Sequence, residues 1–585
     1  MQARIGLRAV SWPRGGPLVL IALGLAQMHA APASSTFGHY APARQYHGQV
    51  SEELYLPMRD GVRLAVRIDR PANEGKPVPG RFPVIWQAGL SVARTQPPAP
   101  GSGAAGLMDV PSLTEYGYVV VQVARRGNGQ SFGSRRGYND RTEAEDAYEV
   151  TEWLAAQPWS TGAIGVYGCS NTGDAAMHAV TIRPPHLKAA FAGCFSWSKY
   201  DAMHRGGIFA QWGTGPQRTI EQDMSVEPLD ADGDRKLLRQ AAEEHQRSTN
   251  LYALWREMPY RDSWSALVGS RFWAEGSIAS YADELRASGV AVYIEGGWHD
   301  ELRDQGLIAL LNLPGARILI GPWKHCQNGS FELLQEMHRF FDTYLRGIDT
   351  GLAAEPRIHY YTMSGQGAGE WRAAESWPVA GIRSTRWYLA RKDVLSQAPP
   401  IREIKQTFRV NTEISCPAGG VGPLMQPCHL PGEGLSFASA PLRAPLEVTG
   451  NAVATLQISA DRTDANVFAS LEDLAPDGRI EVITEGRLKA SLRAEHEPPF
   501  RVPGTPWHRS YAADAQPLVA GESATLRFDL MPTSYVLSAG HRLQLTITGA
   551  DYRERDRDPQ EQGMRIDVYS GAGHLSYLEL PTGGG

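Results

Sequence analysis

Continuous apolar runs alternate with amphipathic segments in the first part of the chain. The runs at 82–89 (FPVIWQAG), 117–124 (GYVVVQVA) and 162–168 (GAIGVYG) each end in turn residues. Apolar runs without polar alternation are typical of strands that are buried on both faces of a parallel sheet. Residues 142–157 place apolar side chains at helical spacing between two of these runs. This alternation predicts a doubly wound α/β domain, whose first part we assign to residues 45–196.

The alternation is interrupted after residue 196. Residues 197–286 are rich in tryptophan and follow a helical pattern with few strand signals, which indicates a helical insertion. Buried-strand patterns resume at 290–297 and 316–323, so residues 287–380 complete the α/β domain. In residues 384–585, short alternating runs are separated by Gly, Pro and Asp turns, which is typical of an antiparallel β-sandwich or jelly roll.

The N-terminal region has the layout of a secretory signal peptide. Arg4, Arg8 and Arg14 precede an apolar run at 17–26, and small residues follow it. A membrane anchor would need about 20 apolar residues, and this run is much shorter. We therefore expect residues 1–33 to be removed on export, which predicts a secreted or periplasmic protein. No later segment is apolar enough to span a bilayer, so we expect no membrane association after removal.

The overall charge excludes one large class of partners. The 585-residue chain has 57 basic and 63 acidic residues, for a formal net charge of −6. Because there is no basic excess, we expect no binding to nucleic acid. The acidic stretch at 229–236 (LDADGDRK) lacks the glycine and glutamate that a calcium loop requires, and no zinc-like cluster of His and Cys is present. We therefore expect no metal.

The five cysteines divide into a pair and three isolated residues. Cys416 and Cys428 lie close together in a loop-like stretch, where an oxidising compartment could close a disulfide, although the reduced form is the open alternative. Cys169, Cys194 and Cys326 lie in apolar surroundings, where cysteine commonly acts as a small hydrophobic residue.

The stretch VYGCSNTG (166–173) carries a serine directly after a predicted buried strand. The nucleophile elbow of serine hydrolases reads G-x-S-x-G, whereas the second glycine here comes one residue later. Small residues must flank such an elbow, and glycine at either position relieves the crowding. The helix that follows would also direct backbone N–H groups toward a developing oxyanion. Ser170 is therefore the candidate nucleophile, with a plain tight turn as the alternative.

A serine nucleophile needs a histidine to accept its proton and a carboxylate to orient that histidine. In α/β-hydrolases these residues occur in the order Ser, Asp or Glu, and His, each in a loop after a strand. Asp300 follows one predicted strand and His325 follows the next. Ser170, Asp300 and His325 are therefore the candidate catalytic residues. The competing acids are Glu295 and Glu301, and the competing bases are His178 and His299.

Three of these stretches resemble motifs of one family. GCSNTG is similar to the G-x-S-x-x-G elbow of the cocaine esterase / X-prolyl dipeptidyl-peptidase (CocE/NonD, peptidase S15) family, GGWHD resembles its aspartate loop, and GPWKH resembles its histidine loop. The similarity extends over nearly the whole mature chain, from MRDGVRLAVRIDRP and RRGNGQSFG to LEDLAPDGR and MPTSYVLSAGHRLQL. It implies an α/β-hydrolase core with an inserted helical cap and a C-terminal jelly roll.

The resemblance also implies a chemistry, namely hydrolysis of esters or amides through an acyl-enzyme without a metal or organic cofactor. The backbone N–H of Asn171 would be one oxyanion donor. Relatives commonly supply the second donor from a tyrosine hydroxyl, but this chain has Ser91 there, beside Leu90. We therefore expect the Ser91 hydroxyl, or a backbone N–H of Leu90 or Ser91, to act as the second donor, with a plain loop residue as the alternative.

We expect the substrate to be a small molecule with an uncharged aromatic or alkyl acyl group, because a tryptophan-rich cap is a suitable apolar roof. Trp197, Trp212 and Trp264 are candidates for lining it, unless they form the core of the cap itself. The sequence thus favours an exported serine hydrolase. The alternatives are an X-prolyl dipeptidyl-peptidase, a cephalosporin-type acylase, and a catalytically silent binding protein whose jelly roll holds a carbohydrate or partner. Assembly into a homo-oligomer is left open.

Overall fold

A computed structural model describes residues 36–92, 110–209, 217–391, 393–416, 427–554, 557–571 and 573–583. The predicted signal peptide and Trp212 lie outside the described residues, so both stay predictions. None of the described helices has the length and apolar character that crossing a bilayer requires.

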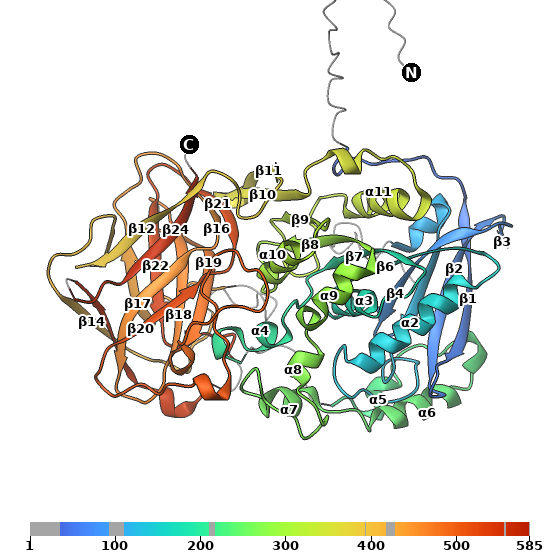
Figure 1. Cartoon of the computed structure of the whole chain (residues 1–585), viewed down its shortest axis with the longest axis horizontal. Helices are drawn as coiled ribbons and strands as arrows, with labels where there is room; N and C mark the ends of the chain where they lie inside the picture. Colours follow the sequence, from blue (N-terminus) through green and yellow to red (C-terminus); the bar gives the residue numbers. More distant parts are fainter. Residues whose placement is uncertain are drawn as a thin grey trace, which may run out of the picture. The chain divides into compact units, whose positions relative to one another are not determined.

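The α/β core is built on one mostly parallel sheet (Figure 1). In spatial order its strands are β1 (Gly48–Pro57), β2 (Arg63–Asn73), β5 (Val119–Ala124), β4 (Phe82–Gly89), β6 (Ser160–Cys169), β7 (Leu187–Gly193), β8 (Ala291–Gly297), β9 (Arg317–Gly321), β10 (Ile358–Ser364) and β11 (Ala368–Ala374). Neighbours from β5 to β10 run parallel, whereas β1, β2 and β11 pair antiparallel, and the short β3 (Lys76–Pro77) pairs with β2. The predicted α/β core is confirmed.

Helices cover both faces of this sheet. Along β4, Val84 and Trp86 pack in one hydrophobic cluster, whereas the intervening Ile85 packs in another. The first cluster includes residues of α2 (Arg141–Ala155), α3 (Asn171–Thr181), α9 (Ala282–Ser288) and α10 (Arg303–Asn312), and the second includes residues of α11 (Leu333–Arg346). Because each strand is buried on both sides, its sequence lacks polar alternation.

The described part of residues 197–286 is helical. It contains α4 (Lys199–Met203), α5 (Ile220–Asp223), α6 (Lys236–His245), α7 (Leu251–Arg256), α8 (Phe272–Glu275) and α9. Among these residues the sole β-pairing is an isolated bridge between Ser265 and Ser270. Trp255 and Trp273 stack with ring centroids 5.2 Å apart inside a small hydrophobic cluster that also includes Leu302 of the α/β core. The insertion therefore has a small core built mostly from its own residues.

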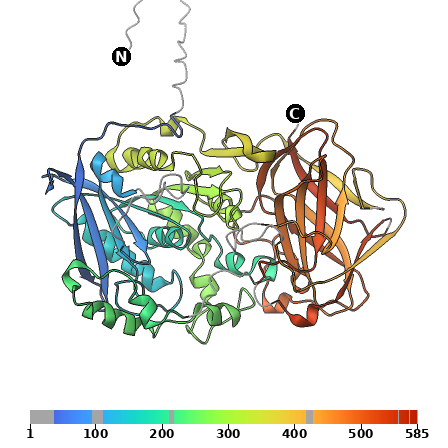
Figure 2. The ribbon, with the colours of Figure 1, turned by 180° about the vertical axis from the view of Figure 1, so that it is seen from behind.

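The C-terminal part is β-rich, and Figure 2 shows its strands beside the α/β core. The strands are β12 (Ile382–Ala390), β13 (Val394–Ser396), β14 (Ile404–Arg409), β15 (Gly434–Ala438), β16 (Leu446–Gly450), β17 (Val453–Ala460), β18 (Asn466–Leu474), β19 (Ile480–Lys489), β20 (Ala524–Asp529), β21 (Thr533–Leu537), β22 (Arg542–Thr548), β23 (Arg565–Ser570) and β24 (Tyr577–Gly583). Their mutual pairings are antiparallel except for β13 with β15. The β-rich domain is confirmed, and its jelly-roll connectivity stays a prediction.

Buried ion pairs join this domain to the residues that follow β8. Glu301 pairs with Arg487 of β19 at 2.6 Å, and Arg303 pairs with Glu485 of β19 at 3.1 Å. Burial alone would raise the pKa of Glu485, but Arg303 and Arg553 lower it to about 2. The Glu485 carboxylate therefore stays charged and paired with arginine, and both ion pairs connect the C-terminal domain to the loop that carries Asp300.

Candidate active site

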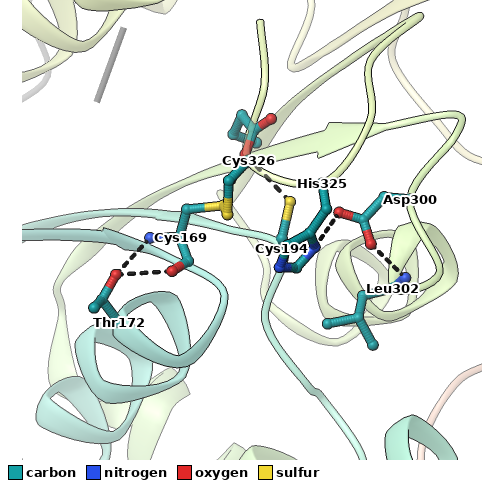
Figure 3. Close-up of a disulfide and its surroundings, with 8 residues drawn as sticks. Cys169, Thr172, Cys194, Asp300, Leu302, His325 and Cys326 are labelled. Carbon is teal, nitrogen blue, oxygen red and sulfur yellow. Dashed lines mark hydrogen bonds and ion pairs between the residues drawn. A yellow bond between two sulfur atoms is a disulfide. The ribbon is translucent and has the colours of Figure 1, made fainter. Parts of the chain in front are cut away.

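Ser170 stands at a sharp turn between β6 and α3. Its backbone has φ 63° and ψ −130°, a conformation that costs an L-residue about 1–3 kcal/mol and that concentrates at functional sites. The Ser170 N–H donates to the carbonyl of Gly193 on the neighbouring strand β7 at 3.0 Å. The Thr172 hydroxyl closes the turn, since it accepts from the Cys169 N–H at 2.9 Å and donates to the Cys169 carbonyl at 2.8 Å (Figure 3). The turn has the geometry of a nucleophile elbow.

The late glycine of the elbow has a steric explanation. A Cβ at Gly173 would collide with the Gly193 carbonyl oxygen, and a Cβ at Gly168 would collide with the Thr172 carbonyl. The position that has no room for a side chain is therefore Gly173, the third residue after Ser170. At the second position, the Thr172 side chain has room and makes the hydrogen bonds that close the turn. The departure from G-x-S-x-G is thus compatible with the same elbow.

The loops after β8 and β9 bring an acid and a histidine together. His325 Nδ1 lies 2.8 Å from Asp300 Oδ2, and Asp300 Oδ1 accepts the Leu302 N–H at 2.7 Å (Figure 3). Asp300 is 1% exposed, and the His325 side chain is 20% exposed. Burial opposes charge on both groups, but their mutual attraction lowers the pKa of Asp300 and raises the pKa of His325. Asp300 therefore favours the charged carboxylate and His325 favours the protonated imidazole, as expected of a histidine base that is oriented by a carboxylate.

The competing residues are placed less well for these roles. His178 Nε2 faces the Gly276 carbonyl at 3.2 Å, and burial lowers the pKa of His178 and of His299 to about 4. Burial, followed by the charge of Asp300, raises the pKa of Glu295 to about 8, so its carboxyl is mostly protonated at neutral pH. Glu301 is paired with Arg487.

A disulfide connects the two loops of the site. Cys169, directly before Ser170, is bonded to Cys326, directly after His325, with the Cα atoms 5.8 Å apart (Figure 3). The interpretation of Cys169 and Cys326 as small hydrophobic residues is therefore wrong, whereas Cys194 is a buried free thiol. Cys416 and Cys428 form the disulfide that their spacing suggested. The missed signal was that both bridged cysteines adjoin candidate catalytic residues.

The predicted oxyanion residues lie at the same edge of the sheet. Ser91 follows β4, which pairs with β6, while Asn171 begins α3, whose first N–H groups lack intrahelical partners. Arg125 donates to the Asn171 side chain at 2.9 Å and through its backbone N–H to the Gly89 carbonyl at 2.9 Å.

The stretch RRGNGQSFG (125–133) has a structural role that its sequence alone did not reveal. Gln130 accepts the Val92 N–H at 3.1 Å and donates to the Val92 carbonyl at 3.0 Å. A Cβ at Gly129 would collide with the backbone of Leu90 and Ser91. This stretch therefore packs against the loop that carries Ser91 and fixes its backbone.

The tryptophan predictions fare differently. Trp197 is fully buried and packs against Phe500, which agrees with the alternative that it belongs to a hydrophobic core, and its role in lining the substrate site stays a prediction. Trp264 is 64% exposed, and Trp212 lies outside the described residues.

A cleft of about 690 Å³ adjoins the loop that carries His325. Its lining includes Trp323 and Lys324 from the core and His429, Ile480 and Glu481 from the C-terminal domain.

Comparison with known proteins identifies the family. Residues 60–327 match the model of the X-Pro dipeptidyl-peptidase (S15) family, and residues 350–579 match that of the X-Pro dipeptidyl-peptidase C-terminal non-catalytic domain. The chain belongs to the S15 family of serine hydrolases. A candidate serine esterase of Mycobacterium bovis is 29% identical, with 92% of this chain and 96% of that protein covered. The cocaine esterase of Rhodococcus sp. is 25% identical, with 91% of this chain and 98% of that protein covered.

Two solved structures share the fold of this chain. A CocE/NonD family hydrolase from Staphylococcus aureus superposes with a TM-score of 0.71 at 20% identity, over 91% of this chain and 94% of the other. An α-amino acid ester hydrolase superposes with a TM-score of 0.67 at 18% identity, over 95% of this chain and all of the other (100%). The predicted resemblance of the chain to the CocE/NonD, peptidase S15 family is therefore confirmed, whereas the catalytic roles of Ser170, Asp300 and His325 stay predictions.

Proposed function

We propose that this S15-family chain is an exported hydrolase that cleaves small-molecule esters or amides through an acyl-enzyme on Ser170. His325 accepts the hydroxyl proton as Ser170 attacks the carbonyl carbon, and then donates it to the leaving alcohol or amine. Water attacks the acyl group with His325 again as the base, which releases the acid and restores Ser170. Asp300 holds the histidine in the required tautomer. The observation that carries the proposal is the 2.8 Å contact between His325 and Asp300 beside a strained elbow that carries Ser170.

The negative charge of the tetrahedral intermediate would form beside the start of α3. There the Asn171 N–H and the positive end of the helix would stabilise it, together with the Ser91 hydroxyl or a backbone N–H of Leu90 or Ser91. Arg125 and Gln130 support this arrangement, because they hold the Asn171 side chain and the backbone at Val92. Such prior positioning lowers the cost of reorganisation during the reaction.

The contacts of Glu301 and Arg303 favour substrates without a free α-ammonium group. The family resemblance implies that members acting on α-amino acyl groups hold the ammonium with a carboxylate cluster, partly on residues just after the catalytic aspartate. Here Glu301 is already paired with Arg487, and Arg303 follows it with a positive charge paired to Glu485. Neither position offers a carboxylate for a substrate amine. The cleft of about 690 Å³ beside the histidine loop is the proposed substrate site.

Export is supported by the cysteines. Disulfides persist mainly in oxidising compartments such as the periplasm and the cell exterior, and this chain contains two. They agree with removal of residues 1–33 during secretion.

A substrate panel tests the proposed function. Purified wild-type protein and Ser170→Ala are assayed with short-chain p-nitrophenyl esters, X-Pro dipeptide amides and acylated β-lactams. We expect the wild type to hydrolyse the esters fastest and the variant to be inactive. Faster cleavage of X-Pro amides or β-lactams would instead assign the peptidase or acylase activity. Absence of turnover with every substrate would favour a silent binding protein.

The second oxyanion donor is tested at Ser91. If its hydroxyl donates to the oxyanion, Ser91→Ala loses about 2.7–4 kcal/mol of transition-state stabilisation, a hundred- to thousandfold in kcat. We expect this loss with little change in KM for a short ester, because the bond forms mainly in the transition state. Ser91→Thr retains a hydroxyl and is the matched control. An unchanged kcat in Ser91→Ala would exclude the hydroxyl as the donor.

A further inference from the structure

The Cys169–Cys326 disulfide joins the two residues that adjoin the proposed nucleophile and base. Ser170 directly follows Cys169 in the sequence, and His325 directly precedes Cys326. The bridged residues are 157 positions apart in sequence. Cys169 is the last residue of β6 and Cys326 lies in the loop after β9, and these strands are separated in the sheet by β7 and β8. The bond therefore connects the elbow to a loop that no direct strand pairing ties to it.

The loops on both sides of the bridge have strained backbones. Ser170, Cys194 and Cys326 all have positive φ, at 63°, 48° and 52°, although none is glycine. Such conformations persist only where surrounding contacts hold them. For Cys326, the bond to Cys169 is one such contact, and it acts directly on the residue beside His325.

Buried groups behind the bridge favour its persistence. Cys194 and the Glu295 carboxyl lie 3.6 Å apart, and Glu295 Oε2 lies 3.9 Å from Cys169 Sγ. Burial, followed by the charge of Asp300, raises the pKa of the Cys194 thiol well above its ordinary value. Since the thiolate is the form that attacks a disulfide, the neighbouring free thiol exchanges slowly with the bridge.

We propose that Cys169 and Cys326 are positioning residues, whose disulfide holds the Ser170 hydroxyl within reach of the His325 imidazole. This inference rests on the proposed function. The bridge links the serine to the histidine, but it does not link the histidine to its acid. The Asp300 carboxylate is held separately, by the Leu302 N–H. Opening the bridge should therefore lower turnover while leaving the Asp300–His325 pair intact.

The test compares the wild type with the double variant Cys169→Ala/Cys326→Ala on a short p-nitrophenyl ester. We expect kcat to fall about a hundredfold, which is the usual cost of misplacing reacting groups by about 1 Å. KM should change little, and the midpoint of the acid limb of kcat/KM should stay in place because the Asp300–His325 pair persists. A loss explained by unfolding would instead appear in urea denaturation, and kcat calculated per folded molecule would then equal that of the wild type, which would overturn the positioning role.

Reduction of the folded wild type is the second measurement. One dithiothreitol supplies two electrons and two protons, becomes a cyclic disulfide and leaves Cys169 and Cys326 as thiols. Cys326 is partly exposed, so a small reductant has access to the bridge. We expect kcat to fall to the level of the double variant and to return when oxidised glutathione takes the two electrons back.

The double variant is also the control for the Cys416–Cys428 bridge, which dithiothreitol opens too. Because Cys416 and Cys428 line the proposed substrate cleft, any effect of opening their bridge appears in the double variant alone. We expect the reductant to lower the kcat of the wild type far more than that of the variant. Equal kcat in the double variant and the oxidised wild type would overturn the positioning role, and so would a reductant effect of the same size in both proteins. If Ser170→Ala retained activity, the proposed function itself would fail, which separates the two results.

Discussion

Replacement of Ser170 by alanine is expected to reduce kcat for a p-nitrophenyl ester about a millionfold, to the level left by the oxyanion donors and binding alone. The loss is this large because the residues of a catalytic triad act as a unit. KM for the residual reaction should change much less, since the cleft beside the histidine loop is untouched. The measurement is steady-state hydrolysis with protein whose near-UV circular dichroism matches the wild type.

Ser225→Ala is the matched control for this substitution. Ser225 is exposed and lies on the helical insertion, where its hydroxyl donates to the Gln222 carbonyl. We expect the control to keep wild-type kcat and KM. Retention of more than about a thousandth of wild-type turnover in Ser170→Ala would show that another group is the nucleophile, because the whole millionfold loss is expected of this one oxygen.

Asp300→Asn is expected to lower kcat about ten-thousandfold while leaving the fold intact. Asparagine fits the same space, but it cannot stabilise the imidazolium and favours the wrong histidine tautomer. In the wild type, Asp300 raises the pKa of His325 above its ordinary value against the effect of burial. Because only the neutral imidazole accepts a proton, kcat/KM should rise with pH around a midpoint above about 6.5. In Asp300→Asn, burial remains without the carboxylate, so this midpoint should move down.

Glu295→Gln distinguishes the acid from its neighbour. The Glu295 carboxyl is mostly protonated at neutral pH, so the amide is a close substitute for it. We expect kcat at pH 7 to change far less than in Asp300→Asn. The opposite order of effects, with the larger loss in Glu295→Gln, would transfer the role of the acid to Glu295.

The sequence predicts those parts of the fold that depend on local pattern. The continuous apolar runs correspond to β4, β5 and β6. A strand that is buried on both faces has apolar residues at successive positions, so this pattern can be recognised from the local sequence. The elbow at Ser170, the acid at Asp300 and the base at His325 were predicted because each follows a strand, and parallel strands end at one edge of a sheet. The contact between Asp300 and His325 agrees with that reasoning.

Long-range contacts account for most of what the sequence did not predict. The apolar surroundings of Cys169 and Cys326 are visible in the sequence, but their pairing depends on two loops that meet only in the folded sheet. The residue type of Trp197 does not distinguish a core position from a position that lines a pocket. Its burial follows from contacts such as that with Phe500, which is distant in the sequence. The role of Gln130 likewise depends on the position of Val92, 38 residues earlier in the chain.

Labelling with a fluorophosphonate probe tests the central claim most directly. The probe phosphonylates a serine only when a neighbouring base activates it, so it reports the nucleophile and its activation in one experiment. We expect a single adduct on the wild type, mapped by peptide mass spectrometry to Ser170, and almost no adduct on His325→Ala. A protein that stays unlabelled while folded, or that is labelled at another serine, would contradict the account.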